Sequence, residues 1–205
     1  DNNVVVTWHT SGIKTIEDAT KKDYPIGATG LNTSSQYPQA LNMVAGTRFK
    51  IILGYPGANE VNLAMENGEV AGRGSNSWAS YKATKPDWIR DKKMNVLVQI
   101  GLERSPDLPD VPLLMELAKN DEDKKLFDLL TIPDAVGRPY IVSKAVPKDR
   151  LDILRAGFDA TMKDAEFLAE AKKLQMPIEP ISPQRMAEIT QRILATPKNI
   201  VDLTK

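Results

Sequence analysis

The stretch from Gly27 to Ser35 carries the residue types best suited to binding an anion. It reads Gly-Ala-Thr-Gly-Leu-Asn-Thr-Ser-Ser and joins a strand-like run, Tyr24–Ala28, to a helix-like run, Gln36–Ala45. The first turn of a helix has backbone N–H groups without internal partners, and the helix dipole adds partial positive charge there. Such a turn suits an anion, of which a carboxylate is the simplest. The candidate carboxylate ligands are Thr29, Gly30, Thr33, Ser34 and Ser35.

A plainer interpretation of this turn stays open. Every helix needs a cap, and Thr33, Ser34 or Ser35 could serve only as that cap. One helix terminus contributes about 0.3–1 kcal/mol to anion binding, whereas micromolar affinity needs about 8 kcal/mol. The turn therefore needs other groups to complete a site.

Two further turns of small residues follow strand-like runs. The turn Gly54-Tyr55-Pro56-Gly57 ends the run Phe49–Leu53, and the turn 74–78 follows the run Glu69–Arg73. The repeat of strand, small-residue turn and helix predicts a parallel α/β sheet with right-handed crossovers. Ligands bind at the carboxyl ends of such strands, so we expect the turns at 29–35, 54–58 and 74–78 to converge.

The second and third turns add candidate ligand-binding residues. Arg73, at the end of a predicted strand, could face a carboxylate as a bidentate fork or form an ordinary salt bridge. Tyr55 could offer its phenol or cover the sheet edge, and polar residues after Arg73 could bind a second carboxylate or cap a helix. These additions are Tyr55, Gly57, Arg73, Ser75, Asn76 and Ser77.

Three ring-bearing residues are expected near the cleft. Trp8 and His9 end the buried strand that contains Val4–Val6 and begin a segment that crosses between lobes. A lone histidine is more often structural than ligand-binding. Trp78 could form a wall of the site, although a core position is the more common one for tryptophan.

The composition excludes several classes of site. The chain has 205 residues, 41% hydrophobic and 26% charged, with a formal net charge of +0. This neutrality gives no indication of nucleic acid or an anionic membrane as partner. With no cysteine and a single histidine, we expect no metal site, no cofactor and no cysteine nucleophile. No apolar run has the length of a membrane span, and no export signal lies in this chain.

The composition also changes along the chain. Before about residue 135 the pattern is α/β, and after it the chain is mainly helical apart from a strand-like run, Arg138–Ser143. We expect a crossing strand at 1–10, an α/β ligand-binding lobe at 11–135, and a return to the other lobe at 136–205. The apolar spacing of the helix at 147–164 requires a partner sheet.

These motifs together resemble the substrate-binding receptors of tripartite tricarboxylate transporters, the Bug receptors. The similarity covers essentially the whole chain in order, and Glu103–Pro112, a proline-rich stretch, is its most specific part. The other matching segments are Gly27–Ser35, Gly54–Gly57, Gly68–Val70 and Val146–Arg150.

The resemblance implies a type II periplasmic-binding fold that closes two lobes on a small di- or tricarboxylate or related acid. It implies a periplasmic, non-enzymatic receptor that delivers its ligand to the membrane components of a tripartite transporter, without inserting into the membrane. Family members carry a first-lobe segment before the position of Asp1. We therefore expect one complete parallel-sheet lobe, the mostly helical C-terminal part of a second, and an oligomer if that second lobe is incomplete.

Two other functions remain open. The chain could be a truncated or regulatory domain that senses a carboxylate, because such a domain has the same cleft. It could also be an α/β enzyme acting on a small anionic metabolite. The enzyme is disfavoured because the sequence has no phosphate-binding glycine motif and no convincing nucleophile–histidine pair.

Overall fold

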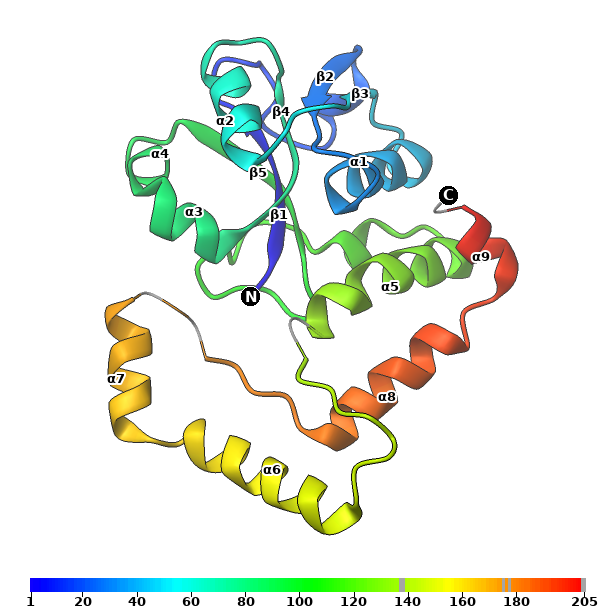
Figure 1. Cartoon of the computed structure of the whole chain (residues 1–205). Coiled ribbons are helices and arrows are strands. Elements are labelled where there is room, and N and C mark those ends of the chain that lie inside the picture. The colour runs from blue at the N-terminus through cyan, green and yellow to red at the C-terminus, as the bar shows by residue number, and fades with distance from the viewer. Residues whose placement is uncertain (137–138, 175, 177, 204–205) are drawn as a thin grey trace.

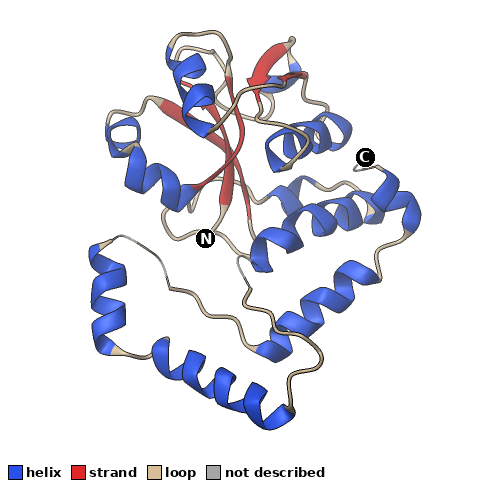
Figure 2. Cartoon of the chain, viewed as in Figure 1, coloured by secondary structure: helices blue, strands red, loops and turns tan. Residues whose placement is uncertain are grey.

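The computed structural model describes residues 1–136, 139–174, 176 and 178–203. Among these, one five-stranded sheet has the order β3-β2-β4-β1-β5, and helices cover both of its faces (Figures 1 and 2). The strands are β1 Asn3–Trp8, β2 Tyr24–Gly27, β3 Phe49–Ile52, β4 Gly72–Ser77 and β5 Met94–Ile100. The helices of this part are η1 Asp18–Thr20, α1 Thr33–Val44, α2 Ala58–Glu66, α3 Trp78–Thr84, α4 Pro86–Arg90, η2 Leu114–Leu117 and α5 Asp121–Val136.

The sheet is mixed, which corrects the prediction of a parallel sheet. β2 pairs in parallel with β3 and β4, but β1 pairs antiparallel with both β4 and β5. The residues of β1 are buried from Val4 onward and, apart from Thr7, apolar, which indicates a central position in the sheet. A central strand is buried on both faces whichever way it runs. The pattern of buried residues therefore does not show that β1 runs opposite to the other strands.

Two cores lie on the two faces of the sheet. One contains Tyr37, Leu41 and Phe127 and lies under α1 and α5. The other contains Trp78, Tyr81 and Trp88 and lies under α2, α3 and α4. This division places α1 and α2, the helices that follow the first two small-residue turns, on opposite faces.

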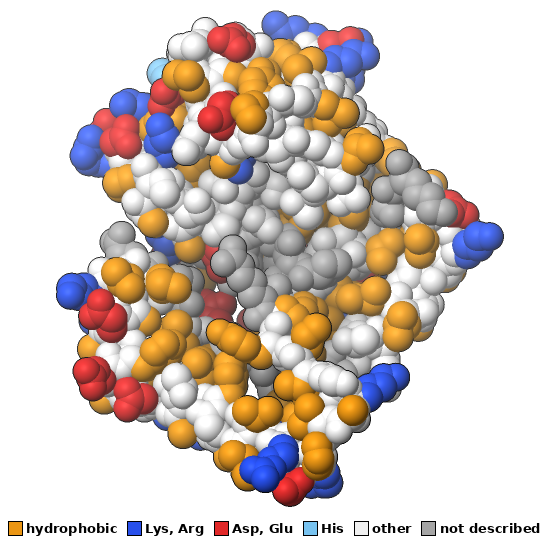
Figure 3. Space-filling view, in the orientation of Figure 1, with side chains coloured by type: hydrophobic (Ala, Val, Ile, Leu, Met, Phe, Trp, Pro, Cys, Tyr) orange, Lys and Arg blue, Asp and Glu red, His pale blue; other side chains and the backbone are white. Residues whose placement is uncertain are grey.

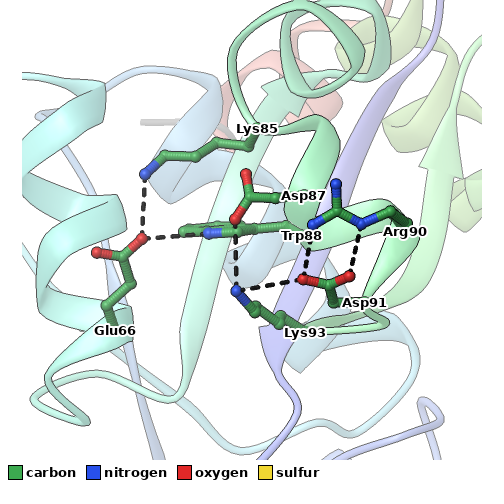
Figure 4. A network of polar contacts seen from close by, with 7 residues as sticks. All are labelled: Glu66, Lys85, Asp87, Trp88, Arg90, Asp91 and Lys93. Atoms are coloured by element: carbon green, nitrogen blue, oxygen red, sulfur yellow. Dashed lines mark hydrogen bonds and ion pairs between the residues drawn. The ribbon is translucent and has the colours of Figure 1, made fainter.

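A polar network fixes α4 against α2 on the second face (Figure 4). Glu66 Oε1 accepts hydrogen bonds from Trp88 Nε1 at 3.1 Å and Lys85 Nζ at 3.0 Å. The Lys85 ammonium also lies 4.7 Å from the centre of the Trp88 ring. The indole is thereby held in the core with its polar edge satisfied.

The C-terminal part is a chain of helices with little burial. Its helices are α6 Lys148–Thr161, α7 Ala165–Lys173, α8 Pro183–Leu194 and α9 Lys198–Asp202. α8 and α9 contact α5, and each has one buried residue, Ile189 and Ile200 respectively. α6 has no buried residue, so the partner sheet that its apolar spacing requires does not lie against it in the described residues. Figure 3 shows hydrophobic side chains gathered over the lower, helical part.

The strand predicted at Arg138–Ser143 is not formed in residues 139–143, and Arg138 lies outside the described residues. Tyr140 and Ile141 are 91% and 86% exposed. A β-branched and aromatic run becomes a strand only beside a partner strand, and none of the described strands lies beside it. No helix in the described residues is long and apolar enough to cross a membrane.

Candidate functional site

The turn between β2 and α1 is closed by Asn32, a residue that the sequence analysis did not select. Asn32 Oδ1 accepts hydrogen bonds from the Ser34 amide at 2.9 Å and from Ser34 Oγ at 2.7 Å. Ser34 Oγ itself accepts a hydrogen bond from the Thr29 amide at 3.1 Å. The helix cap is therefore Asn32 rather than Thr33, Ser34 or Ser35, and the known preference of N-caps for asparagine was the signal that could have revealed it.

This arrangement decides which donors of the turn remain for an anion. The Ser34 and Ser35 side chains are buried, and Ser35 Oγ donates to the Asn32 carbonyl at 3.0 Å. The amides of Gly30, Leu31 and Thr33 make no hydrogen bond to the described part of the chain. Backbone amides at the start of α1, more than the serine hydroxyls, are thus the groups that the turn offers to a carboxylate.

Arg73 is the second group of the candidate site that favours an anion. It lies in β4 beside Gly27, the last residue of β2, and is 7% exposed. Its Nη1 donates to Asn62 Oδ1 at 3.2 Å and, over a long 3.5 Å, to the Ala58 carbonyl. Burial lowers the pKa of its guanidinium, because the charged form is poorly solvated there.

Arg73 has no ion pair with a carboxylate in the described residues, although the exposed cations of the chain form many. The alternative of an exposed salt bridge does not hold for Arg73 in this part of the structure, because the residue is buried. A buried cation without a counter-charge is costly. That cost is a reason to expect an anion at Arg73 in another state of the protein.

The first two turns converge as predicted. β2 and β3 run in parallel and end at the same level, with Gly27 opposite Ile52. A Cβ atom on Gly27 would lie 3.3 Å from the Tyr55 ring and 2.8 Å from the Val61 side chain. Gly27 therefore lets the Tyr55 turn approach the end of β2. Gly57 is the N-cap of α2, and a Cβ atom there would lie 2.8 Å from Glu60 Oε2.

The third turn is a strand, which corrects the prediction for 74–78. β4 spans Gly72–Ser77 and pairs with β1, with Asn76 opposite Val4 and Ser77 opposite Asn3. Small polar residues fit this strand because α1 packs closely on it. A Cβ atom on Gly74 would lie 2.0 Å from the Ser34 carbonyl oxygen. The third segment thus also reaches the first turn, but from within the sheet.

The hydroxyl group of Ser77 at the end of β4 is already engaged, and Ser75 is buried. Ser77 is the N-cap of α3, and its Oγ accepts from the Ser80 amide at 3.1 Å and donates to the Asp1 carboxylate. Another Asp1 oxygen accepts from the Ala79 amide at 3.2 Å. A carboxylate of the chain itself therefore occupies the position predicted for a second ligand carboxylate.

Trp8 and His9 lie at one end of the strands, and the two turns that follow β2 and β3 lie at the other end. Because β1 is antiparallel, its last residue, Trp8, pairs with Met94 at the beginning of β5. The Trp8 ring packs 4.7 Å from the Trp88 ring centre, and His9 is exposed. The expectation that they line the same cleft is thus corrected by the direction of β1.

Trp78 is a core residue at the edge of a hollow. It is 6% exposed, and its Nε1 donates to Asp107 Oδ2 at 3.1 Å. It borders a hollow of about 1090 Å³ that extends to α7. A second hollow, of about 1610 Å³, extends from Ser77 to α6 and α8. Both hollows open at the end of the sheet where strands β4 and β5 terminate.

Comparison with known structures shows what this architecture is similar to. A TctC solute-binding protein from Polaromonas aligns with 98% of this chain and 66% of its own, at a TM-score of 0.66 and 16% identity. An R. palustris protein solved with adipate aligns with 99% of this chain and 65% of its own, at 0.62 and 13%. MatC from Rhodopseudomonas palustris, with bound malate, aligns with 100% and 66%, at 0.60 and 14%.

The fold of this chain is similar to that of a large part of TctC and Bug periplasmic binding proteins. The periplasmic binding protein BugD also matches, at a TM-score of 0.59 and 15% identity. The chain spans about 65% of the length of these TctC-like structures. No protein-family model and no curated protein sequence matches the chain.

Proposed function

We propose that this protein is a solute receptor of the TctC and Bug type that captures a small organic acid through its carboxylate. The observation that carries the proposal is made within the described residues: amides without hydrogen bonds at the start of α1 lie near a buried Arg73 that has no carboxylate partner and sits beside the end of β2. Both elements favour an anion, and no chemical step is needed to explain them. The TctC-like fold supports the same class, since two similar structures hold adipate and malate.

The proposed mechanism is closure around the ligand. The carboxylate first binds the amides of the turn at 29–35, and an opposing lobe closes over it from the side of the sheet edge where the two hollows open. Binding energy then favours the closed state in proportion to its extra contacts. In this proposal residues 11–135 form the ligand-binding lobe, segment 1–10 crosses into it as strand β1 between β4 and β5, and segment 136–205 returns to the opposing lobe.

The proposed setting follows from the same comparison. One matching structure is the periplasmic binding protein BugD and another is a periplasmic transporter, so we propose that the receptor works in the periplasm. It would deliver its ligand to the membrane components of a tripartite tricarboxylate-type transporter. A carboxylate-sensing domain is the alternative role, and the genes that accompany this one would distinguish the two.

The proposal is tested by removing one donor without disturbing the helix. Proline is favoured at the first position of a helix, so Thr33→Pro deletes the Thr33 amide while α1 keeps its start. Asn32 before it is extended, at φ −142°, which is compatible with a following proline. Thermal-shift and calorimetric titration with di- and tricarboxylates should show binding to the wild type and weaker binding to the variant.

The control for this test is Thr84→Ala, which removes a hydroxyl at the far end of α3 that donates to the Ser80 carbonyl. It should bind as the wild type does. If no carboxylate stabilises the wild-type protein, the receptor function is wrong. If Thr33→Pro binds as tightly as the wild type, the turn is not the binding element.

A further inference from the structure

The outer edge of β3 is partly closed by a side chain from another element. β3 is an end strand of the sheet and pairs only with β2 (Figure 1). The carbonyls of Arg48 and Ile52 accept hydrogen bonds from amides of β2 and of the residue after it. Alternate residues direct their backbone groups to opposite sides of a strand, so the amides and carbonyls of Phe49 and Ile51 point away from β2.

Asn42 of α1 binds the outward groups of Phe49 as a neighbouring strand would. Its Nδ2 donates to the Phe49 carbonyl at 2.9 Å, and its Oδ1 accepts from the Phe49 amide at 2.9 Å. The hydroxyl of buried Thr47 also donates to Asn42 Oδ1, at 2.7 Å. The Asn42 side chain therefore has one orientation, because its oxygen faces two donors. Phe49 thus has no outward group left for another strand.

The edge beyond Phe49 is free and apolar. The outward amide and carbonyl of Ile51 make no hydrogen bond in the described residues. The side chains of Ile52 and Leu53 are 43% and 49% exposed. Unpaired backbone groups beside exposed apolar side chains form a template on which another chain can add a strand.

We propose that this edge is a latent interface for a second copy of the chain, and that Asn42 and Lys50 keep it closed. Asn42 limits strand pairing to Ile51, and the charge of Lys50 opposes the pairing that remains. The latent interface does not depend on the proposed function, because it lies on the outer edge of the sheet and uses none of the candidate ligand-binding residues.

The sequence of β3 fits an antiparallel copy of itself. With Ile51 opposite the same residue of the second copy, Phe49 lies opposite Leu53 and Lys50 lies opposite Ile52. A two-fold axis through the central pair makes each of these contacts occur twice, as in the commonest class of homodimer. The outward groups of Phe49 are needed at both ends of this pairing, and Asn42 already holds them.

The same register explains the part of Lys50. Lys50 and Ile52 lie on one face of the strand, so two copies place their lysines on the same face, diagonally about 7–8 Å apart. Lys50 and Arg48 share the carboxylate of Asp23, at 3.4 and 2.7 Å, so one negative charge serves two cations. Pairing would bring two such surpluses of positive charge together. A lysine on an exposed edge is a known protection against edge pairing.

Freeing the edge should make the chain associate. Asn42→Ala combined with Lys50→Val removes both the closing side chain and the charge. Sedimentation velocity over a range of concentrations should show the average mass rising toward twice that of the wild type. Adding Ile51→Pro should reverse this association, because proline removes the amide at the centre of the pairing. Proline is tolerated on an edge strand where the amide faces away from the sheet.

Two further variants separate strand pairing from loss of stability. Asn95→Ala removes another partly buried asparagine, which lies on the other end strand, β5, and donates to the Ile13 carbonyl at 2.9 Å. It should lower the melting temperature without association. Thr47→Val combined with Lys50→Val only releases Asn42 to turn. This milder pair should fold as the wild type does and associate at higher concentration.

The outcomes decide the proposal in either direction. Association that persists with Ile51→Pro, or that also appears in Asn95→Ala, overturns the latent interface. A folded protein with Asn42→Ala and Lys50→Val that sediments as the wild type does at every concentration also overturns it. If that variant does not fold, the Thr47→Val and Lys50→Val pair decides by the same criterion.

Discussion

At the scale of single residues, Asn32 determines the shape of the candidate site. Its side chain holds the Ser34 amide and hydroxyl, and Ser34 holds the Thr29 amide. This short series of hydrogen bonds closes the turn and leaves the amides of Gly30, Leu31 and Thr33 without a hydrogen bond in the described residues. A residue that touches no ligand in the proposal thus orients those that do.

Replacing Asn32 should therefore weaken both the helix and the site. Asn32→Ala removes the cap of α1 and should lower the free energy of unfolding by about 1 kcal/mol. Asn32→Asp keeps an acceptor at the same position and should retain most of that stability. Urea denaturation of the three proteins measures the difference, and equal stability of the alanine variant would show that the cap is unimportant.

Tyr81 should give the protein a distinctive response to alkaline pH. The folded state raises the pKa of Tyr81 to about 12, whereas an unfolded tyrosine ionises near about 10. The stability that this difference provides is present below about pH 10 and is lost as the pH rises through the folded pKa. Tyr81→Phe should reduce the alkaline loss of unfolding free energy, and an unchanged pH profile would contradict the burial of this hydroxyl.

At the scale of elements, close packing of α1 on β4 depends on Gly74. A Cβ atom at this position would lie 2.0 Å from the Ser34 carbonyl oxygen and 2.5 Å from Pro38 Cγ. Neither a backbone oxygen nor a proline ring moves easily. The glycine thus sets how near the start of α1 comes to the sheet.

Gly74→Ala should force α1 away from β4 and destabilise the protein by about 1–3 kcal/mol. Gly157→Ala is the control, because Gly157 lies in α6 with nothing within 4 Å of the added atom. An alanine in that exposed helix should stabilise by about 0.5–1 kcal/mol. Thermal unfolding tests the pair, and a neutral Gly74→Ala would show that α1 does not pack as described.

The sequence predicted most elements but not how they pair. The turns predicted before α1 and α2 are present, because glycine and hydroxyl residues after an apolar run favour a turn through their own backbone and side-chain preferences. β4 was misplaced because Gly72–Ser77 has the composition of a turn and becomes a strand only between β1 and β2. The position of Trp8 was wrong for a similar reason, since strand direction is a property of the whole sheet.

The candidate site was predictable in part. Arg73 and the turn at 29–35 were found from residue type and position after a strand. Tyr81 and Asn62 lie within helices, where a polar side chain has no local signal for a partner on β4. Their role depends on contacts between distant segments, which one sequence without relatives does not reveal.

At the scale of the whole molecule, burial is unevenly distributed. β1 and β5 carry most of the fully buried residues of the sheet, whereas α6 has none and its Ile153 and Leu154 are 62% and 53% exposed. Stability should follow this distribution, because local opening costs little where few apolar contacts are lost.

Hydrogen exchange followed by mass spectrometry should show this contrast directly. Peptides from β1 and β5 should remain protected, whereas those from α6 and α7 should exchange early. Protection of α6 equal to that of β5 would show that its apolar face is covered in solution.

Leu154→Ala and Leu41→Ala are a matched pair of substitutions, one in exposed α6 and one in the core. Leu154→Ala should lower the free energy of unfolding by less than about 0.5 kcal/mol, and Leu41→Ala should lower it by about 2–5 kcal/mol.

The most direct test of the central claim is a crystal structure of the protein with the carboxylate that stabilises it most in the thermal-shift panel. The account predicts a carboxylate on the amides of Gly30 and Thr33, on the side of the β2 end where Arg73 lies. A ligand bound elsewhere, with the turn at 29–35 unoccupied and Arg73 unchanged, would contradict it.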